Sequence, residues 1–141
     1  MESPGQVSLA CPNVPSAPGS GSVPDVTFPV TQRDDLVVVT TPDEIDIGNA
    51  WQLREALLSA AVTGPPAVIV DMSGTEFCDS TGLNVLVRAL KRATEEGSEL
   101  RLVVRGTALL RILTVSGVGS MFRVYDSLDL ALEAPRQQQS A

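Results

Sequence analysis

The most constraining feature of the chain is a six-residue run, Ala67-Val68-Ile69-Val70-Asp71-Met72, which is almost wholly apolar and rich in β-branched side chains. Strands with this composition have both faces covered, as in the middle of a parallel sheet. The run therefore predicts a central strand with helices packed on the sheet.

Strand and helix patterns alternate through the rest of the chain. Residues 36–40 and 100–104 follow strand patterns, while apolar residues recur at helical spacing over 49–62 and 83–97. Weaker patterns predict strands at 26–30 and 122–125, a short helix around 109–113 and a last helix after the capping residue Ser127. Pro29 cannot donate a ladder hydrogen bond, so the first strand should lie at an edge, joined to the second by a turn at 33–35. We predict an α/β layer fold whose mixed sheet is largely parallel, has an antiparallel edge strand and packs with about four helices.

The chain is long enough for one folded domain. Its 141 residues divide into a Pro/Gly/Ser-rich arm at 1–24, a folded part at 25–134 and a tail at 135–141 that holds three consecutive glutamines. The arm carries five prolines and a single charged side chain, Glu2. Such a stretch cannot bury enough apolar surface to offset its ordering entropy, so we expect the arm to be disordered and the tail to be flexible.

Charge and residue usage exclude several classes of function. The formal net charge is −7, which disfavours nucleic acids and anionic membranes as partners. The chain has no His, which excludes Ser-His-Asp and Cys-His catalysis as well as His-containing zinc sites. Two cysteines are too few for a Cys-only zinc site. We therefore expect no metal, no cofactor and no catalytic residue.

The same composition indicates a cytoplasmic protein. The first 24 residues contain no Lys or Arg and no long apolar run, so no signal peptide is visible. No segment reaches 18 apolar residues, which excludes a membrane-spanning helix. Two cysteines do not make a disulfide framework, so a reducing compartment is the simpler interpretation.

One segment could carry chemistry. The central strand ends near Asp71, and after a short loop Asp79-Ser80-Thr81-Gly82 opens a helix. Ligands collect beyond the carboxyl ends of parallel strands, and a helix N-terminus there offers unpaired N–H groups. A hydroxyl at this point is exposed and tolerates an added negative charge. The alternative is that Asp79 and Ser80 are ordinary helix-capping residues.

The motif Phe77-Cys78-Asp79-Ser80-Thr81-Gly82-Leu83, placed after the buried strand, resembles the signature of the STAS domain and, more narrowly, of bacterial anti-sigma factor antagonists. Two further segments, Glu44-Ile45-Asp46 and Ser116-Gly117, are similar to motifs of that family. The resemblance covers about residues 25–134. One departure is Asp43, which stands where the family has a glycine.

The resemblance implies a partner switch. The serine that matches Ser80 is phosphorylated by an anti-sigma factor that is also a serine kinase of the GHKL type, with Thr81 the weaker candidate acceptor. The unphosphorylated antagonist binds this kinase and releases the sigma factor, phosphorylation breaks the complex, and a phosphatase of the PP2C type restores it. The implied partner-binding residues are Asp46, Asp71, Asp79, Ser80, Thr81 and Gly82.

Such a switch is physically reasonable for these residues. A phosphoserine carries about −1.5 to −2 charges at neutral pH. On Ser80 it would lie beside Asp79 and near Asp46 and Asp71. Like charges that face an interface weaken binding strongly, so we expect local exclusion of the partner rather than unfolding.

Several alternatives remain open at this point. Cys78 precedes the acceptor, and a thiol near a helix N-terminus can have a lowered pKa, which would allow a redox role with Cys11 as disulfide partner. The other interpretation is that Cys78 is a small buried residue. Trp51 is either a filler of the core or its rim, or a binding anchor.

The fold also allows other functions. Related domains are accessory subunits of lipid transport or nucleotide-binding sensor modules. An enzyme that used Ser80 as nucleophile would lack a base, because the only Lys, Lys91, lies more than two helical turns away.

Overall fold

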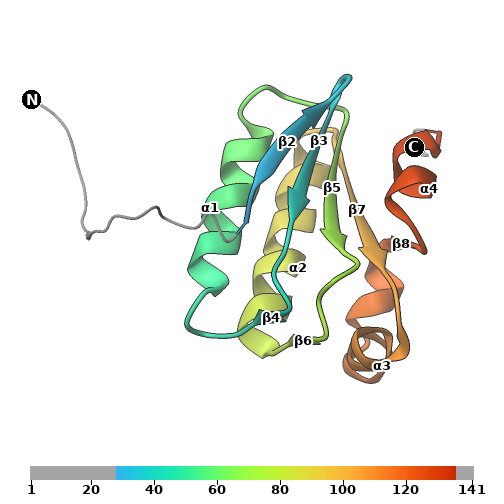
Figure 1. Cartoon of the computed structure of the whole chain (residues 1–141). Helices are drawn as coiled ribbons and strands as arrows, with labels where there is room; N and C mark the ends of the chain where they lie inside the picture. The colour runs from blue at the N-terminus through green and yellow to red at the C-terminus, as the bar shows by residue number, and fades with distance from the viewer. Residues whose placement is uncertain (1–27, 136–141) are drawn as a thin grey trace, which may run out of the picture.

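The computed structural model describes residues 28–135, and these form a five-stranded sheet with helices on both faces (Figure 1). The strand order is β2-β3-β5-β7-β8; the first pair is antiparallel and the other pairs are parallel. The strands are β2 (Val30–Arg33), β3 (Leu36–Thr40), β5 (Ala67–Met72), β7 (Glu99–Val104) and β8 (Arg123–Tyr125). The helices are α1 (Ala50–Ala61), α2 (Ser80–Glu95), α3 (Thr107–Ser116) and α4 (Leu128–Glu133). The predicted fold class is confirmed.

The apolar run from the sequence is the central strand β5. It pairs in parallel with β3 on one side and with β7 on the other, and only Asp71 among its residues is not buried. Both faces are covered by helices, which explains why the run shows no alternation of polar and apolar residues. The predicted arm at 1–24, Val26 and residues 136–141 of the predicted tail lie outside the described residues.

Residues 26 and 27 of the predicted first strand lie outside the described residues, and of its other residues only Val30 is in a strand. Strand β2 runs over Val30–Arg33, pairs only with β3 and forms an edge of the described sheet. Pro29 precedes the strand and contributes only its carbonyl oxygen, which accepts a hydrogen bond from the N–H of Thr40 at 3.0 Å. This fits the absence of an N–H on proline.

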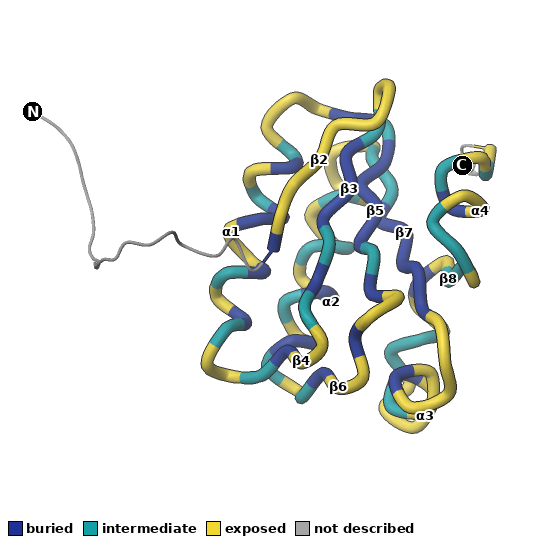
Figure 2. Tube along the Cα trace, viewed as in Figure 1, coloured by how far each residue is buried: buried dark blue, intermediate teal, exposed yellow. Residues whose placement is uncertain are grey.

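The sheet divides the core into two layers, and helices cover each layer. Helices α1 and α2 cover one face of the sheet, and α4 covers the other (Figure 1). Residues of β3, β5 and β7 therefore form the dark central band in Figure 2. The larger cluster holds Leu53, Leu57, Leu86 and Leu102, whereas the smaller one joins Val38, Ile69, Val103 and Ala131.

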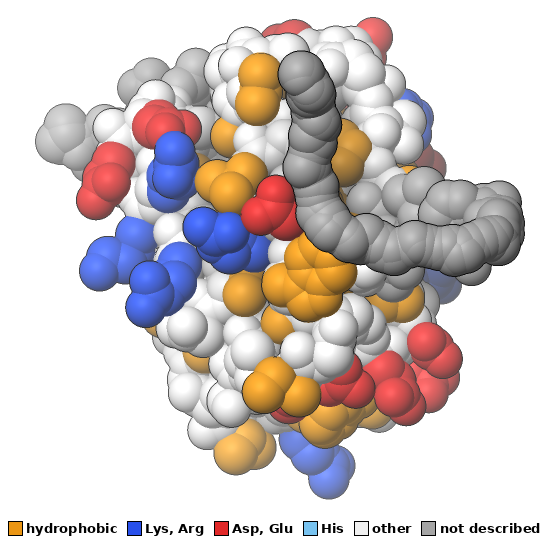
Figure 3. Space-filling view, turned by 90° about the vertical axis from the view of Figure 1, so that its left-hand side faces the viewer, with side chains coloured by type: hydrophobic (Ala, Val, Ile, Leu, Met, Phe, Trp, Pro, Cys, Tyr) orange, Lys and Arg blue, Asp and Glu red, His pale blue; other side chains and the backbone are white. Residues whose placement is uncertain are grey.

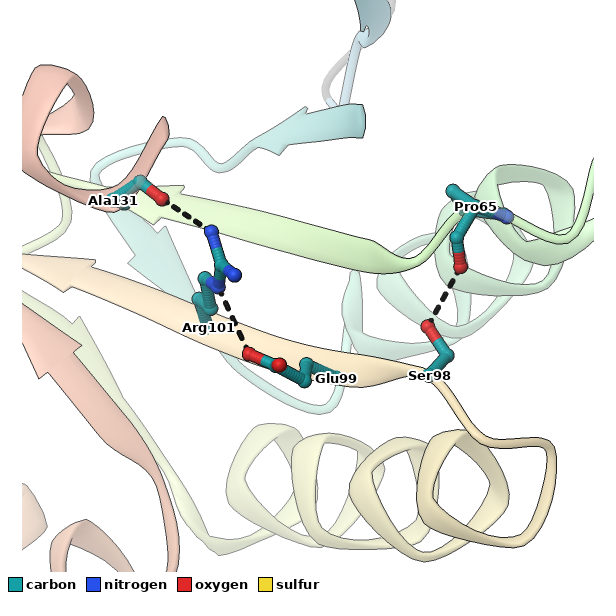
Figure 4. A network of polar contacts seen from close by, with 5 residues as sticks. All are labelled: Pro65, Ser98, Glu99, Arg101 and Ala131. Carbon is teal, nitrogen blue, oxygen red and sulfur yellow. Dashed lines mark hydrogen bonds and ion pairs between the residues drawn. The ribbon is translucent and has the colours of Figure 1, made fainter. Parts of the chain in front are cut away.

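A buried arginine ties α4 to the sheet (Figure 4). The Arg101 side chain is 3% exposed and donates to a Glu99 carboxylate oxygen at 3.1 Å and to the Ala131 carbonyl at 2.7 Å. The Glu99 carboxylate balances the buried charge of Arg101, and the Ala131 carbonyl of α4 accepts a hydrogen bond from a second guanidinium N–H group. At the start of the same strand, the Ser98 hydroxyl donates to the Pro65 carbonyl at 2.9 Å.

Three short elements were not predicted from the sequence. Strand β4 (Glu44–Ile45) pairs in parallel with β6 (Phe77–Cys78), and a short 3-10 helix, η1 (Val118–Met121), follows α3. The β4–β6 pair lies at the end of the molecule where α2 begins (Figure 1). Among residues 28–135, no helix combines the length and the apolar character needed to cross a membrane.

Candidate functional site

Two segments, residues 41–46 with strand β4 and residues 73–79 with strand β6, are joined by backbone hydrogen bonds. The Asp43 carbonyl accepts from the N–H groups of Glu76 at 2.8 Å and Phe77 at 3.3 Å. One residue past β6, the Asp79 N–H donates to the Ile45 carbonyl at 3.0 Å. These bonds fix the segment that holds Asp46 next to the segment that begins α2.

Buried threonine hydroxyls reinforce the same junction. Thr41 and Thr75 share a hydrogen bond, and the Thr75 hydroxyl also reaches the Pro42 carbonyl. The Thr41 hydroxyl donates to the Asp71 carbonyl at the end of β5. Sequence reasoning missed both threonines, because an isolated loop threonine carries no pattern that distinguishes a buried one from an exposed one.

The Ser80 side chain is exposed at the first residue of α2. Asp79 is the N-cap, and its carboxylate accepts from the N–H groups of Thr81 at 2.9 Å and Gly82 at 3.1 Å. The expectation of unpaired N–H groups at this helix start is therefore wrong for Thr81 and Gly82. The capping interpretation of Asp79 is confirmed, and its negative charge already occupies the positive end of the helix.

The other two predicted aspartates organise the neighbouring loops. An Asp46 carboxylate oxygen accepts from the Gly48 N–H at 2.9 Å, and an Asp71 carboxylate oxygen accepts from the Ser73 N–H at 3.1 Å. Both residues are half-buried. Asp46 lies beside the α2 start through the β4–β6 pair, and Asp71 lies at the carboxyl end of β5. The end of the molecule that carries Ser80 is thus rich in carboxylates.

Exposed apolar side chains lie beside these carboxylates. Ile47 is 78% exposed, Trp51 is 61% exposed and Phe77 is 44% exposed. Figure 3 shows hydrophobic and acidic side chains together at the lower end of the molecule, where β4 and β6 lie in Figure 1. We call the surface made by Ile47, Trp51, Phe77 and Ser80 the switch face. The exposure of Trp51 rules out a place in the core and leaves a filler at the rim or a binding anchor.

Gly82 has a different role from the other predicted partner-binding residues. It is buried, and a Cβ atom at its position would lie 2.7 Å from the Cys78 sulfur and 2.7 Å from Cγ2 of Ile45. Only a residue without a side chain allows α2 to approach β4 and β6 this closely. Gly82 therefore acts by packing, and it offers no side chain to a partner.

The surroundings of Cys78 oppose the predicted lowered pKa. The residue is 1% exposed, and burial together with the charge of Asp79 raises the pKa of the thiol to about 12. A raised pKa keeps the thiol protonated, whereas redox chemistry needs the thiolate. Cys11, its predicted disulfide partner, lies outside the described residues. The structure favours the interpretation of Cys78 as a small core residue.

Within residues 28–135, no cluster of three or more His, Cys, Asp or Glu side chains has a geometry that could hold a metal ion. The carboxylates at the β4–β6 end instead bond to backbone N–H groups of their own loops. Their arrangement can stabilise loops and repel anions at the surface.

Comparison with known proteins identifies similar chains. The family model described as the STAS domain matches residues 27–131. The chain is 30% identical over 107 residues to an anti-sigma-F factor antagonist, RsfA, of Mycobacterium tuberculosis. The matched region covers 74% of this chain and 84% of the relative. It is also 30% identical over 94 residues to the anti-sigma-B factor antagonist of Bacillus subtilis, across 67% of this chain and 85% of the relative.

Solved structures give the same picture. An anti-sigma factor antagonist from Mycobacterium paratuberculosis superposes with a TM-score of 0.71 at 33% identity, covering 79% of this chain and 94% of that one. A putative anti-sigma factor antagonist from Thermotoga maritima superposes with a TM-score of 0.69 at 26% identity, covering 78% and 95%.

Proposed function

The chain belongs to the STAS domain family, and we propose that it is an anti-sigma factor antagonist that docks on its anti-sigma factor through the switch face. The names of its relatives support this role. So does the surface itself, because exposed aromatic and aliphatic side chains such as Trp51 and Ile47 are typical anchors of a protein interface. The antagonist form sequesters the anti-sigma factor in the cytoplasm and thereby releases the sigma factor.

The switch that we propose is phosphorylation of Ser80 by the anti-sigma factor, acting as a GHKL-type serine kinase. The exposed hydroxyl at the start of α2 is the observation that carries this proposal. Thr81 is the weaker acceptor, since it is half-buried and its N–H is bonded to Asp79. A phosphatase of the PP2C type returns the protein to its binding form.

Electrostatics explain how the phosphate acts. The carboxylate of Asp79 already accepts hydrogen bonds from the N–H groups of Thr81 and Gly82. These two helix donors are therefore not available to a phosphate on Ser80. The added charge of about −1.5 to −2 then remains largely uncompensated on the surface that meets the partner. A loss of only about 1.4 kcal/mol in binding weakens the complex tenfold.

The experiment is a capture from the source cells with four immobilised proteins: wild type, Ser80→Ala, Ser80→Glu and the control Ser59→Glu. Ser59 is exposed on α1, so its substitution adds the same charge away from the switch face. Wild type, Ser80→Ala and Ser59→Glu should capture an anti-sigma factor with a kinase domain, and Ser80→Glu should not. Equal capture by Ser80→Glu, or capture of no such protein by wild type, would contradict the proposal.

A further inference from the structure

A groove of about 610 Å³ runs between α1 and α2, and it begins at Asn84, about one helical turn after Ser80. Its apolar lining comes from both helices and includes Leu57, Leu58 and Ala61 of α1 and Val85 and Ala89 of α2. A second hollow of about 430 Å³ shares Ala61, Glu96 and Ser98 with it and extends it towards the loop before β5. The groove follows α2 for about three helical turns, from Asn84 to Glu95.

Positive side chains line this groove. Arg54 of α1 and Arg88, Lys91 and Arg92 of α2 contribute to its wall, which is four of the ten Lys and Arg in a chain of net charge −7. The same wall holds two carboxylates, Glu95 and Glu96, so the cations outnumber the acidic side chains. Figure 3 shows several Lys and Arg side chains gathered on the left of the view, with acidic side chains above them. The groove therefore differs in sign from the switch face.

The positive charge is only partly balanced by the protein itself. Arg54 pairs with Glu55 at 3.1 Å and Arg92 with Glu96 at 3.4 Å, and all four side chains are about half exposed or more, so these pairs are weak. Across residues 28–135, Arg88 and Lys91 have no ion-pair partner, and both are exposed. Arg88 and Lys91 thus lie beside the apolar floor of the groove, and no carboxylate among the described residues forms an ion pair with them.

We propose that this groove is a docking site for an acidic amphipathic helix of a partner protein. A helix laid between α1 and α2 would place an apolar stripe on the groove floor and acidic flanks against Arg88 and Lys91. Charge complementarity selects this occupant, because four cations in the lining outnumber its two carboxylates and a basic segment would meet an excess of like charge. Nucleic acid fits less well, because the groove lies on a strongly acidic chain.

This docking site is separate from the proposed switch. The groove begins at Asn84, about 6 Å along the helix axis from Ser80, and its cations Arg88 and Lys91 lie about 12 Å and 16 Å away. Phosphorylation of Ser80 should therefore leave the groove free to bind, so that one protein could hold a second partner in both states of the switch.

The test uses a synthetic 18-residue peptide as probe, with leucines at helical spacing on one face and glutamates on its flanks. A matched peptide carries lysines in place of the glutamates. Binding to the full chain is measured by fluorescence anisotropy, and its place by backbone amide shifts in NMR. The acidic peptide should bind, with the largest shifts at Leu58, Ala61, Val85 and Ala89, and the lysine peptide should not.

Charge reversal locates the site. The double variant Arg88→Glu/Lys91→Glu should weaken binding of the acidic peptide at least tenfold. The control Arg33→Glu/Arg111→Glu changes the net charge equally at exposed positions elsewhere and should bind like wild type. Circular dichroism checks that both variants are folded; should the first not fold, Arg88→Gln alone replaces it, with a smaller loss expected.

Other results would overturn the proposal. These are absence of binding, equal binding of the lysine peptide, an equal loss in the control variant, or shifts confined to other surfaces. If ATP displaces the peptide and shifts the same residues, the groove binds a small anion instead. If the wild-type protein forms a dimer that the Arg88/Lys91 variant does not form, the groove binds a second copy of the chain instead. Ser80→Glu should bind the peptide normally and the Arg88/Lys91 variant should still capture the anti-sigma factor, so the two proposals fail separately.

Discussion

Cys78 and Ser80 lie two residues apart and have opposite environments. Cys78 ends β6 and points into the core between Ile45 and Gly82, whereas Ser80 begins α2 and is exposed. Asp79, between them, accepts two backbone N–H groups and fixes the change of direction. The serine hydroxyl is therefore available to a kinase, and the thiol is not available to an oxidant.

The raised pKa of Cys78 makes a prediction about reactivity. In a Cys11→Ser variant, which leaves one thiol, Ellman's reagent should label the folded protein very slowly at pH 8 and the denatured protein fully. The sign of the pH effect on stability follows from the same shift. The protonated thiol stabilises the fold fully below its ordinary pKa of 9.0, and this contribution is lost as the pH rises towards about 12.

Two observations would contradict this view of Cys78. One is labelling of the native variant at the rate of a free exposed thiol. The other is a Cys11–Cys78 disulfide in the wild-type chain under mild oxidation, seen on a non-reducing gel, with the fold retained.

The helices and strands that could be predicted from the sequence are those whose residue pattern lies within one continuous segment of the chain. The apolar run of β5, the apolar spacing in α1 and α2 and the Ser127 cap of α4 each depend on neighbours along the chain. The Ser127 hydroxyl indeed accepts from the Leu130 N–H at 3.2 Å. Local periodicity and capping residues are sufficient to place such elements.

Elements that depend on distant pairing could not be predicted in this way. Strands β4 and β6 have two residues each and exist only because Glu44 pairs with Phe77 and Ile45 with Cys78. The occupied N–H groups at the start of α2 are what the capping interpretation of Asp79 predicted, because aspartate is a preferred N-cap residue. The family motif placed Asp46 and Asp79 in one site, although the reason for their proximity is this unpredicted strand pair.

The close packing of α2 on β4 and β6 predicts the effect of Gly82→Ala. The new methyl group would lie 2.7 Å from Cys78 Sγ and from Ile45 Cγ2, so these side chains or the helix must move. Such overpacking costs about 1–3 kcal/mol, while alanine gains at most about 1 kcal/mol in helix propensity. We expect a net loss of about 1–2 kcal/mol in urea unfolding and weaker capture of the anti-sigma factor.

Gly74→Ala is the matched control, because a Cβ atom there has no neighbour within 4 Å. It should unfold like wild type. A Gly82→Ala protein as stable as this control would show that the helix can shift without loss, and the packing role of Gly82 would be wrong.

The whole molecule carries two surfaces of opposite character. The switch face combines apolar side chains with a rim of carboxylates, whereas the α1–α2 groove combines an apolar floor with a wall in which four cations outnumber two carboxylates. The sheet and its two core clusters hold both surfaces on one rigid framework. A phosphate on Ser80 can therefore change what binds at one surface while the fold stays the same.

The most direct test of this account is a calorimetric titration of the purified anti-sigma factor with this protein, before and after complete phosphorylation of Ser80 confirmed by mass spectrometry. We expect at least a tenfold loss of affinity on phosphorylation, with unchanged circular dichroism. Equal affinity of the two forms, or weak binding that is accompanied by loss of helical signal, would contradict a switch that acts through surface charge.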